Sequence, residues 1–298
     1  MVEDTSAVLA VNAPAKVNLY LHVTGKRADG YHTLDSLVAL GGIHDRITAA
    51  PAHDLSLVVE GPFADVTPAG DDNIVLHAAR KLQGMLGVGM GARLTLTKRL
   101  PVAGGIGGGS ADAAGTLRLL TNLWGARPTE AELVHLAREL GADVPVCLAG
   151  RAAYMGGIGE ELTPVPELPK AWILLVNPNE QLSTKAVFDR FAGPYSEPAR
   201  LTTAPTTPGQ LAAELIKRKN DLTETAVSIV PAVGRVLETL EALPGCLMAR
   251  MSGSGATCFG LFADPAGVTQ AALQLVKERP AWWAKPASLE WDASALNI

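Results

Sequence analysis

The sequence has little of several features on which common protein classes depend. Three of its 298 residues are cysteines, and Cys147, Cys246 and Cys258 are widely spaced and form no CxxC pair. We therefore expect buried, reduced thiols in a cytosolic protein. The net charge is −5 and no basic block exceeds Lys217-Arg218-Lys219, so a general nucleic-acid surface is not expected.

Export signals, membrane spans and metal motifs are also missing. The start, MVEDTSAVLA, is acidic and has no long apolar region, which argues against a signal peptide. Apolar runs such as Trp172–Val176 are too short to cross a bilayer. The six histidines show no HExxH or similar spacing, so no dedicated metal site is expected. Together these absences predict a cytoplasmic protein with no membrane or nucleic-acid partner.

The composition that remains is that of a folded protein. Hydrophobic residues make up 48% of the chain and charged residues 18%, which allows a full core and argues against disorder. The length suggests about two domains. The triple-proline stretch Pro164–Pro169 is the best candidate linker, so we divide the chain into residues 1–166 and 167–298. The Pro/Ala/Thr-rich run Thr202–Pro208 is expected to be an exposed loop.

Hydrophobic periodicity predicts strands and helices mixed in both halves, which favours an α+β fold. Asp71 or Asp72 is expected to cap the first helix, and Thr129 with Glu132 matches a capping box. Strands are predicted at Val17–Val23, Leu55–Val59, Arg93–Lys98, Trp172–Val176, Leu247–Met251, Thr257–Phe262 and Ser288–Trp291. Helices are predicted at Asn73–Leu86, Ser110–Trp124, Thr129–Leu140, Thr184–Phe191, Gly209–Lys217, Val233–Leu243 and Ala266–Glu278.

The strongest functional pattern is the glycine-rich stretch Pro101–Gly115. Five of the six residues from 104 to 109 are glycines, which lets the backbone turn sharply and approach a ligand closely. The stretch leaves a predicted strand and enters a predicted helix, whose free N–H groups suit a phosphate, and Ser110 can cap that helix or touch a phosphate oxygen. It is neither a Walker A loop nor a GxGxxG motif. The alternative is a flexible turn, which needs fewer glycines.

Two isolated charged residues, Lys16 and Asp143, are further candidates for a functional site. Lys16 lies near the start of a predicted strand, where a lysine is usually a solvated surface charge. Asn18 shares a face with it if the strand is regular, and such a polar pair among apolar neighbours suggests a site. Asp143 lies between a helix stop and an apolar run. It can be a turn residue, a helix cap or a general base for a substrate hydroxyl.

Two further turns carry weaker patterns. Tyr31 and His32 follow a polar, hairpin-like turn at Lys26–Gly30 and can stack on and hydrogen-bond a base; otherwise they are a partly buried tyrosine and a surface histidine. The small-residue turn Ser252–Thr257 offers backbone N–H groups to an anion. Together with the first loop it suggests two phosphate-bearing ligands facing each other.

These segments, in this order, resemble the GHMP kinase superfamily. The glycine motif Pro101–Ala111 is similar to the superfamily signature, and Ala15–Ser36 is similar almost throughout to the N-terminal block of a branch that acts on a cytidine-linked substrate. Further matching segments are Gly141–Leu148, Gly157–Val165, Lys219–Leu222 and Met251–Phe262. The resemblance implies a two-domain α+β fold, with an N-terminal ribosomal-protein-S5-like domain and a C-terminal ferredoxin-like domain.

The resemblance also implies a set of roles. Lys16 and Asp143 would be the catalytic pair, and Mg²⁺ would bridge the phosphates of ATP. The phosphorylated substrate would be a cytidine-diphosphate-linked methylerythritol of the non-mevalonate isoprenoid pathway, and the protein a monomer or weak homodimer. The residues assigned to this substrate are Asn18, Tyr31, His32, Thr184 and Phe188. Those assigned to ATP are Asn73, Lys98, Pro101, Val102, Ala103, Gly104, Gly105, Ile106, Gly107, Gly108, Gly109, Ser110 and Ala111.

The sequence departs from the superfamily pattern at a few positions and leaves two rival functions open. Val102 and Ala103 stand where Met-Gly is frequent, and Ala111 where a second serine is common. One rival is a related decarboxylase or a kinase of another sugar or amino-acid alcohol, which generally lacks the motif Gly30-Tyr31-His32. The other is a non-catalytic sensor, against which the presence of both Lys16 and Asp143 argues.

Overall fold

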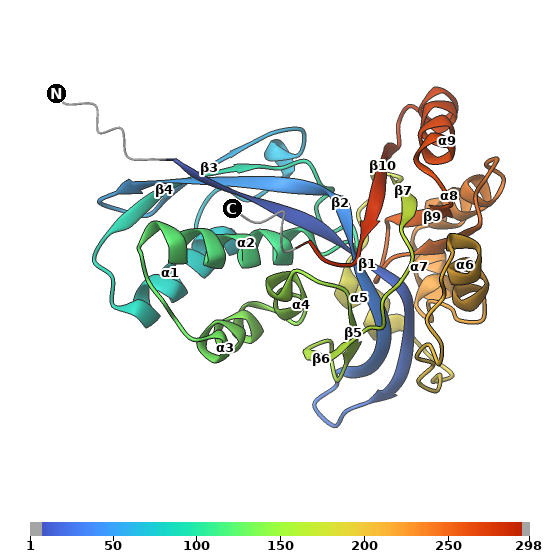
Figure 1. Ribbon diagram of the computed structural model, residues 1–298, viewed down its shortest axis with the longest axis horizontal. Helices are drawn as coiled ribbons and strands as arrows, with labels where there is room; N and C mark the ends of the chain where they lie inside the picture. Colours follow the sequence, from blue (N-terminus) through green and yellow to red (C-terminus); the bar gives the residue numbers. More distant parts are fainter. Residues whose placement is uncertain (1–7, 294–298) are drawn as a thin grey trace.

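The computed structural model describes residues 8–293 and shows the α+β class that the periodicity predicts. The strands described there run in the order β3-β4-β2-β10-β7-β9-β8, with β1 and β5 also paired to β2 and β6 paired to β5. Figure 1 shows two lobes that meet where β2 and β10 lie side by side. Among the described residues, no helix is long and apolar enough to cross a membrane.

The frame of the first lobe is a long antiparallel pair, β1 (Leu9–Lys26) and β2 (His32–Ala52). The turn that joins them covers residues 27–31, close to the polar turn expected at Lys26–Gly30. β1 extends well beyond the predicted strand Val17–Val23, and β2 has no counterpart among the predicted strands. The pairing register shifts on both sides of the Lys16–Asn18 segment. Such bulges redirect side chains and are frequent beside functional sites.

Helices cover one side of this frame. A buried aliphatic cluster joins α1 and α2 to the sheet and includes Val11, Ile47, Leu82, Leu94 and Leu117. The elements of the lobe are β3 (Ser56–Glu60), a short 3₁₀ turn η1 (Ala64–Val66), α1 (Ile74–Leu86), β4 (Gly91–Thr97), α2 (Gly108–Leu123), α3 (Glu130–Leu140), α4 (Val144–Ala149), β5 (Ala153–Gly156) and β6 (Glu161–Pro164).

Helix caps differ from the prediction at two of three places. Asn73, rather than Asp71 or Asp72, caps α1, because its side chain accepts a bond from the N–H of Val75. α2 begins at Gly108 rather than Ser110, and Gly107 is its N-cap, without a side-chain cap bond. The expected capping box of α3 is confirmed, with Thr129 and Glu132 bonded reciprocally.

The second lobe packs helices against the strands β7, β9 and β8. Its core includes Leu174, Leu222, Val233, Phe262 and Leu275. Most predicted elements are present with ends shifted by one or two residues, but the last strand begins five residues before the predicted Ser288–Trp291, and α7 was not predicted. The elements are β7 (Ala171–Asn177), α5 (Thr184–Arg190), α6 (Pro208–Ile216), α7 (Thr223–Ile229), α8 (Ala232–Glu241), β8 (Met248–Met251), β9 (Cys258–Phe262), α9 (Pro265–Glu278) and β10 (Trp283–Glu290). Most residues of the run Thr202–Pro208 are exposed, as expected, but Pro205 is buried.

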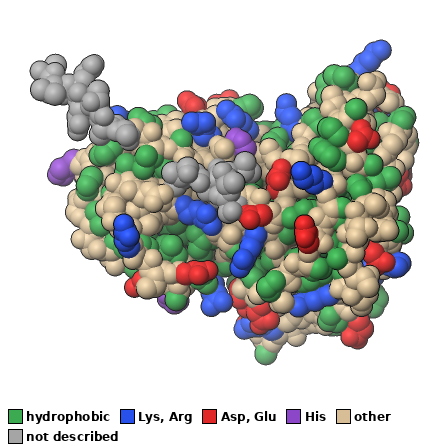
Figure 2. All heavy atoms as spheres, viewed as in Figure 1, with side chains coloured by type: hydrophobic (Ala, Val, Ile, Leu, Met, Phe, Trp, Pro, Cys, Tyr) green, Lys and Arg blue, Asp and Glu red, His purple; other side chains and the backbone are tan. Residues whose placement is uncertain are grey.

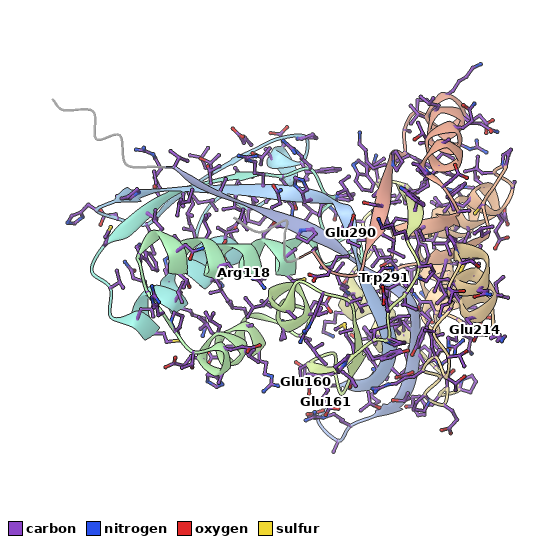
Figure 3. All side chains as sticks on the ribbon, in the orientation of Figure 1. Arg118, Glu160, Glu161, Glu214, Glu290 and Trp291 are labelled. Atoms are coloured by element: carbon purple, nitrogen blue, oxygen red, sulfur yellow. The ribbon has the colours of Figure 1, made fainter. Side chains whose placement is uncertain are left out.

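The last strand joins the two lobes. β10 pairs with β7 over most of its length and with β2 at Leu289 and Glu290. Figure 3 places Glu290 and Trp291 at this junction. The Trp291 indole donates a hydrogen bond of 2.9 Å to the carbonyl of Pro169, inside the predicted linker. The division at residues 166 and 167 stays a prediction.

Charge is dispersed over the visible face of the molecule. In Figure 2, lysine and arginine side chains alternate with aspartate and glutamate, and no large basic area gathers on this face. The three cysteines are free; Cys147 and Cys258 are buried, as expected, whereas Cys246 is half-buried. Burial raises the pKa of all three thiols.

Candidate active site

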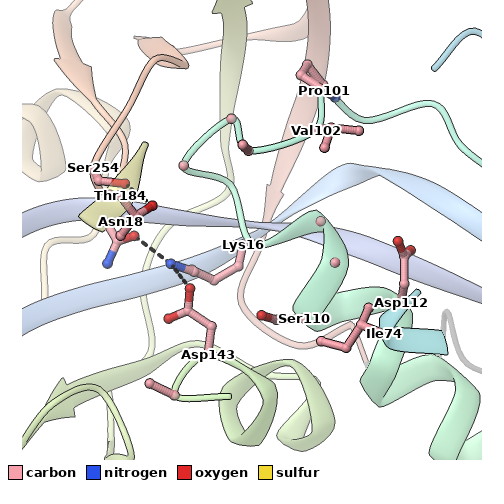
Figure 4. Close-up of a pocket in the computed structure, with 18 of the residues that line it drawn as sticks. Lys16, Asn18, Ile74, Pro101, Val102, Ser110, Asp112, Asp143, Thr184 and Ser254 are labelled. Atoms are coloured by element: carbon pink, nitrogen blue, oxygen red, sulfur yellow. Dashed lines mark hydrogen bonds and ion pairs between the residues drawn. The ribbon is translucent and has the colours of Figure 1, made fainter. Parts of the chain in front are cut away.

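A cavity of about 530 Å³ lies between the two lobes, a size typical of small-molecule sites. Its wall is built by β1, the glycine-rich loop, the start of α1, the residue before α4, α5 and the turn after β8 (Figure 4). The predicted site residues on this wall are Lys16, Asn18, Asn73, Lys98, Pro101, Val102, Ala103, Gly104, Gly105, Gly107, Gly108, Gly109, Ser110, Asp143, Thr184 and Phe188.

The glycine-rich loop lies against the second small-residue turn. Gly105 has φ +73°, and a Cβ there would stand 2.5 Å from the carbonyl oxygen of Ser252 and 2.6 Å from that of Gly255. A side chain at Gly105 would therefore push the two turns apart. The N–H of Thr257 donates 3.0 Å to the carbonyl of Gly104 and ties them together. Gly253 and Ser254 lie on the cavity wall. The two turns thus pack directly together beside one cavity; the two phosphate-bearing ligands expected to face each other there stay a prediction.

The first turn of α2 points its N–H groups at this cavity. Gly108, Gly109 and Ser110 occupy that turn and line the wall. By helix geometry their N–H groups have no partner further back in the helix, and the helix dipole adds positive potential. Because Gly107 caps the helix without a side chain, nothing on the cap competes with an anionic ligand for these donors.

Lys16 and Asp143 meet at the same cavity, from segments far apart in the sequence. The Lys16 ammonium lies 2.9 Å from Asp143 Oδ2 and donates 2.8 Å to Asn18 Oδ1, as Figure 4 shows. The Lys16 side chain is 5% exposed, whereas that of Asp143 is 35% exposed. Asp143 occupies the N-cap position of α4 but makes no side-chain cap bond. Its carboxylate is therefore held by Lys16 and open to a ligand.

Lys98 has a different environment on another part of the wall. Its ammonium bonds Asp45 Oδ2 at 2.5 Å and Asp112 Oδ2 at 2.6 Å, and all three side chains are at least 96% buried. Asp45 Oδ1 also accepts the N–H groups of Arg99 and Leu100. Burial and the Asp45 charge raise the pKa of Asp112 to about 7, against the opposing effect of Lys98. Burial lowers the pKa of Lys98, but the two carboxylates outweigh it and the net direction is upward.

Aromatic side chains gather at the α5 end of the cavity. The ring of His32 stacks on that of Phe188, with centroids 5.5 Å apart and planes 27° apart. Burial, aided by the charge of Lys26, lowers the pKa of His32 against the opposing Asp189. The hydroxyl of Thr184 lies 2.8 Å from that of Ser254. This corner can hold a flat, neutral group against the Phe188 ring.

Four of the residues assigned from sequence do not line the cavity. Ile106 and Ala111 are buried in the core, so within the motif they serve packing. His32 lies behind Phe188, and Tyr31, in the hairpin turn, is 61% exposed.

Several residues on the wall were not anticipated. Asp112 is part of the glycine motif, so its place in that motif was a signal, and Ser36 ends the resembling block Ala15–Ser36. Leu34 and Ile158 lie in the resembling segments Ala15–Ser36 and Gly157–Val165 but received no role, and Met155 carried no sequence signal that separates it from an ordinary core residue. Within residues 8–293, no group of three or more His, Cys, Asp or Glu side chains could hold a metal ion.

Comparisons with known proteins agree on one family. The model described as GHMP kinases N terminal domain matches residues 73–151, and that described as GHMP kinases C terminal matches residues 207–281. A 4-diphosphocytidyl-2-C-methyl-D-erythritol kinase of Rhodospirillum rubrum is 55% identical over 95% of this chain and 93% of its own length. One of the same name from Paramagnetospirillum magneticum is 54% identical over 94% and 98%.

Solved structures give the same picture. A crystal structure of 4-(cytidine 5'-diphospho)-2C-methyl-D-erythritol kinase superposes with a TM-score of 0.76 at 34% identity, covering 95% of this chain and 99% of that one. A homoserine kinase from Cytophaga hutchinsonii has a TM-score of 0.74 at 14% identity, covering 98% of each chain, which is a likeness of fold alone.

Proposed function

The chain belongs to the GHMP kinase family, and from that premise we propose that it transfers the γ-phosphoryl group of ATP to the 2-hydroxyl of 4-diphosphocytidyl-2-C-methyl-D-erythritol, a step of the non-mevalonate isoprenoid pathway. The observation that carries the proposal is the ion pair between Lys16 and the half-exposed Asp143, set across one cavity from the open end of α2. The two close relatives of that name cover nearly the whole chain.

Two side chains carry the chemistry in this proposal. Asp143 accepts the proton of the attacking hydroxyl, because its carboxylate is the exposed member of the pair. Lys16 holds the Asp143 carboxylate in place through their ion pair and counters the charge that develops on the attacking oxygen. Phosphoryl transfer requires positioning and charge neutralisation more than covalent chemistry, and these two groups supply both.

The ATP phosphates rest on the glycine-rich loop and the first turn of α2, where N–H donors and the helix dipole favour an anion. Asn73 and the wall around Lys98 border the rest of the nucleotide. Mg²⁺ fits as an ion that arrives with the triphosphate, because the cavity offers single oxygens from Ser110 and Asp143 rather than a closed set of ligands. It would neutralise phosphate charge.

The cytosine is assigned to the α5 corner. Phe188 offers a ring face, and His32, whose pKa burial lowers, supports that ring from behind. Thr184 and Asn18 lie on the wall within the same cavity. Tyr31 reaches the substrate only at the open rim, since its side chain is largely exposed.

A coupled assay of ADP release tests the function. The protein should phosphorylate the cytidine-diphosphate-linked methylerythritol and leave homoserine and mevalonate untouched. Phosphorylation of homoserine or mevalonate, without turnover of the cytidine-linked substrate, would contradict the proposal. Binding of ATP with no turnover of any of the three would identify a non-catalytic relative.

A further inference from the structure

A chain of buried hydrogen bonds runs from Lys16 through the β1–β2 pair. The Lys16 ammonium donates 2.8 Å to Asn18 Oδ1, and Asn18 Nδ2 donates 2.8 Å to Ser36 Oγ. The Ser36 hydroxyl in turn donates 2.5 Å to the backbone carbonyl of Tyr20. Lys16, Asn18 and Ser36 are all less than 5% exposed, so water competes little for these bonds.

The direction of this chain is fixed from its far end. The carbonyl of Tyr20 can only accept, so the single hydroxyl proton of Ser36 is donated to it. Ser36 Oγ must then accept from Asn18, which places the amide nitrogen of Asn18 on Ser36 and the amide oxygen on Lys16. The reverse orientation would turn the NH₂ group of Asn18 toward an ammonium, donor against donor.

We propose that Ser36 is a positioning residue, which holds the Lys16 ammonium against Asp143 by fixing the side-chain amide of Asn18. Lys16 then has two directed anchors, Asn18 Oδ1 and Asp143 Oδ2. The inference rests on the proposed function only in so far as it calls Lys16 and Asp143 the catalytic pair. The hydrogen-bond chain itself depends on no substrate.

A second serine anchors the backbone of Asn18 and gives an internal comparison. The N–H of Asn18 donates 3.1 Å to Ser252 Oγ, whose proton goes to the carbonyl of Gly105 at 2.9 Å. Ser252 therefore couples β1 to the glycine-rich loop, whereas Ser36 bonds the Asn18 side chain and the Tyr20 carbonyl. Loss of the Ser252 hydroxyl should disturb ATP binding as well as turnover, and loss of the Ser36 hydroxyl should disturb turnover and leave ATP binding unchanged.

The kinetic test compares Ser36→Ala, Ser36→Thr and Ser252→Ala in the full chain. Ser36→Ala should lower kcat about 10- to 100-fold, as expected when a catalytic group moves by about 1 Å, with KM for ATP unchanged. Ser36→Thr keeps the hydroxyl and should restore most of kcat. Ser252→Ala should raise KM for ATP in addition. Thr24→Ala is the matched control, since it removes a hydroxyl bonded across the same two strands, to Thr33, outside the cavity wall.

A spectroscopic readout separates this inference from the proposed function. In protein labelled with ¹⁵N-lysine and free of substrate, the Lys16 ammonium should exchange its protons with water faster in Ser36→Ala than in wild type or Thr24→Ala. The exchange rates can be compared even if the wild type fails to phosphorylate the cytidine-linked substrate. The role of Ser36 and the proposed function are therefore tested independently.

Three results would overturn the positioning role. The first is wild-type kcat and wild-type ammonium exchange in a folded Ser36→Ala. The second is a raised substrate KM at unchanged kcat, which would make Ser36 a substrate contact. The third is a folded Ser36→Thr as slow as Ser36→Ala, because the hydroxyl would then not be the group that matters. Thermal unfolding of each variant checks that it is folded at the assay temperature.

Discussion

Two lysines lie on the wall of the same cavity, and their partners differ in number and burial. Lys16 is paired with one aspartate whose side chain is 35% exposed, and its other partner is the neutral Asn18. Lys98 is paired with two aspartates whose side chains are 0% and 3% exposed. The first arrangement leaves a carboxylate available to a ligand. In the second arrangement, the Lys98 ammonium is bonded to two carboxylates inside the protein.

The difference assigns a chemical role to the pair of Lys16 and Asp143 and a structural role to the Lys98 cluster. Asp45 also accepts the N–H groups of Arg99 and Leu100, where the chain leaves β4, and Asp112 lies on α2. The Lys98 cluster therefore fixes both ends of the glycine-rich loop. Its formal charge is −1, one lysine against two aspartates, so Lys98 offers little net positive charge to a nucleotide. Lys98 lies on the cavity wall, but its ammonium is already bonded to Asp45 and Asp112, and its contact with a nucleotide stays a prediction.

The largest effect should come from the exposed partner of Lys16. Asp143→Asn removes the proton acceptor but keeps the size of the side chain, so kcat should fall about 10²- to 10⁴-fold. ATP affinity should stay unchanged, since the loop and α2 bind the phosphates. Single-turnover kinetics and ATP titration by calorimetry measure the two quantities. Wild-type turnover in Asp143→Asn would contradict the catalytic role of Asp143.

Breaking the buried cluster should act on stability instead. Lys98→Met leaves two buried carboxylates facing each other, and removing one partner of a buried ion pair costs about 3–5 kcal/mol. Urea unfolding followed by circular dichroism should show this loss. Lys16→Met is the comparison variant. Its kcat should fall sharply, and its free energy of unfolding should fall less than that of Lys98→Met. If Lys98→Met were as stable as wild type, the cluster would not carry the architectural role given to it here.

Sequence reasoning did well where one short pattern decides the local structure. The capping box at Thr129 and the strand–loop–helix order around the glycine-rich loop follow from nearby residues. It failed for β2, because Leu37–Leu40 is buried on both faces and shows no alternation. It also placed the cap of α1 on Asp71 or Asp72, since several adjacent polar residues competed for one position.

In the site, too, some contacts were anticipated from the sequence and others were not. The pairing of Lys16 with Asp143 was anticipated through a family resemblance, since the residues themselves left a surface charge and a turn as alternatives. The partners of Lys98 were not anticipated, because Asp45 stands among polar neighbours and contacts Lys98 only through tertiary packing. The chain of hydrogen bonds through Ser36 depends on the register of β1 against β2. That register includes bulges, which hydrophobic periodicity does not reveal.

A smaller effect should appear in the pH dependence of stability. The pKa of Asp112 is raised from 3.8 to about 7 in the folded protein, so between these values the folded state binds more protons than the unfolded state. Its contribution therefore weakens the fold as pH rises from about 4 to about 7, by at most about 1.4 kcal/mol per pH unit. Asp112→Asn removes this term, so its free energy of unfolding relative to that of wild type should rise as pH increases across that window. Urea unfolding at several pH values measures the difference, and parallel curves would mean that Asp112 is ionised throughout.

The smallest effect should come from a third lysine–carboxylate pair, on the surface. Lys81 bonds Glu139 at 2.5 Å, a distance equal to that between Lys98 and Asp45, but both side chains are more than 40% exposed. Lys81→Met should leave kcat and the unfolding midpoint at their wild-type values, because solvent screens the pair and hydrates the glutamate that remains. Thermal unfolding of Lys81→Met beside Lys98→Met compares the same substitution at equal bond length. Equal losses would show that contact distance governs the stability of these pairs, whereas a loss confined to Lys98→Met assigns it to burial.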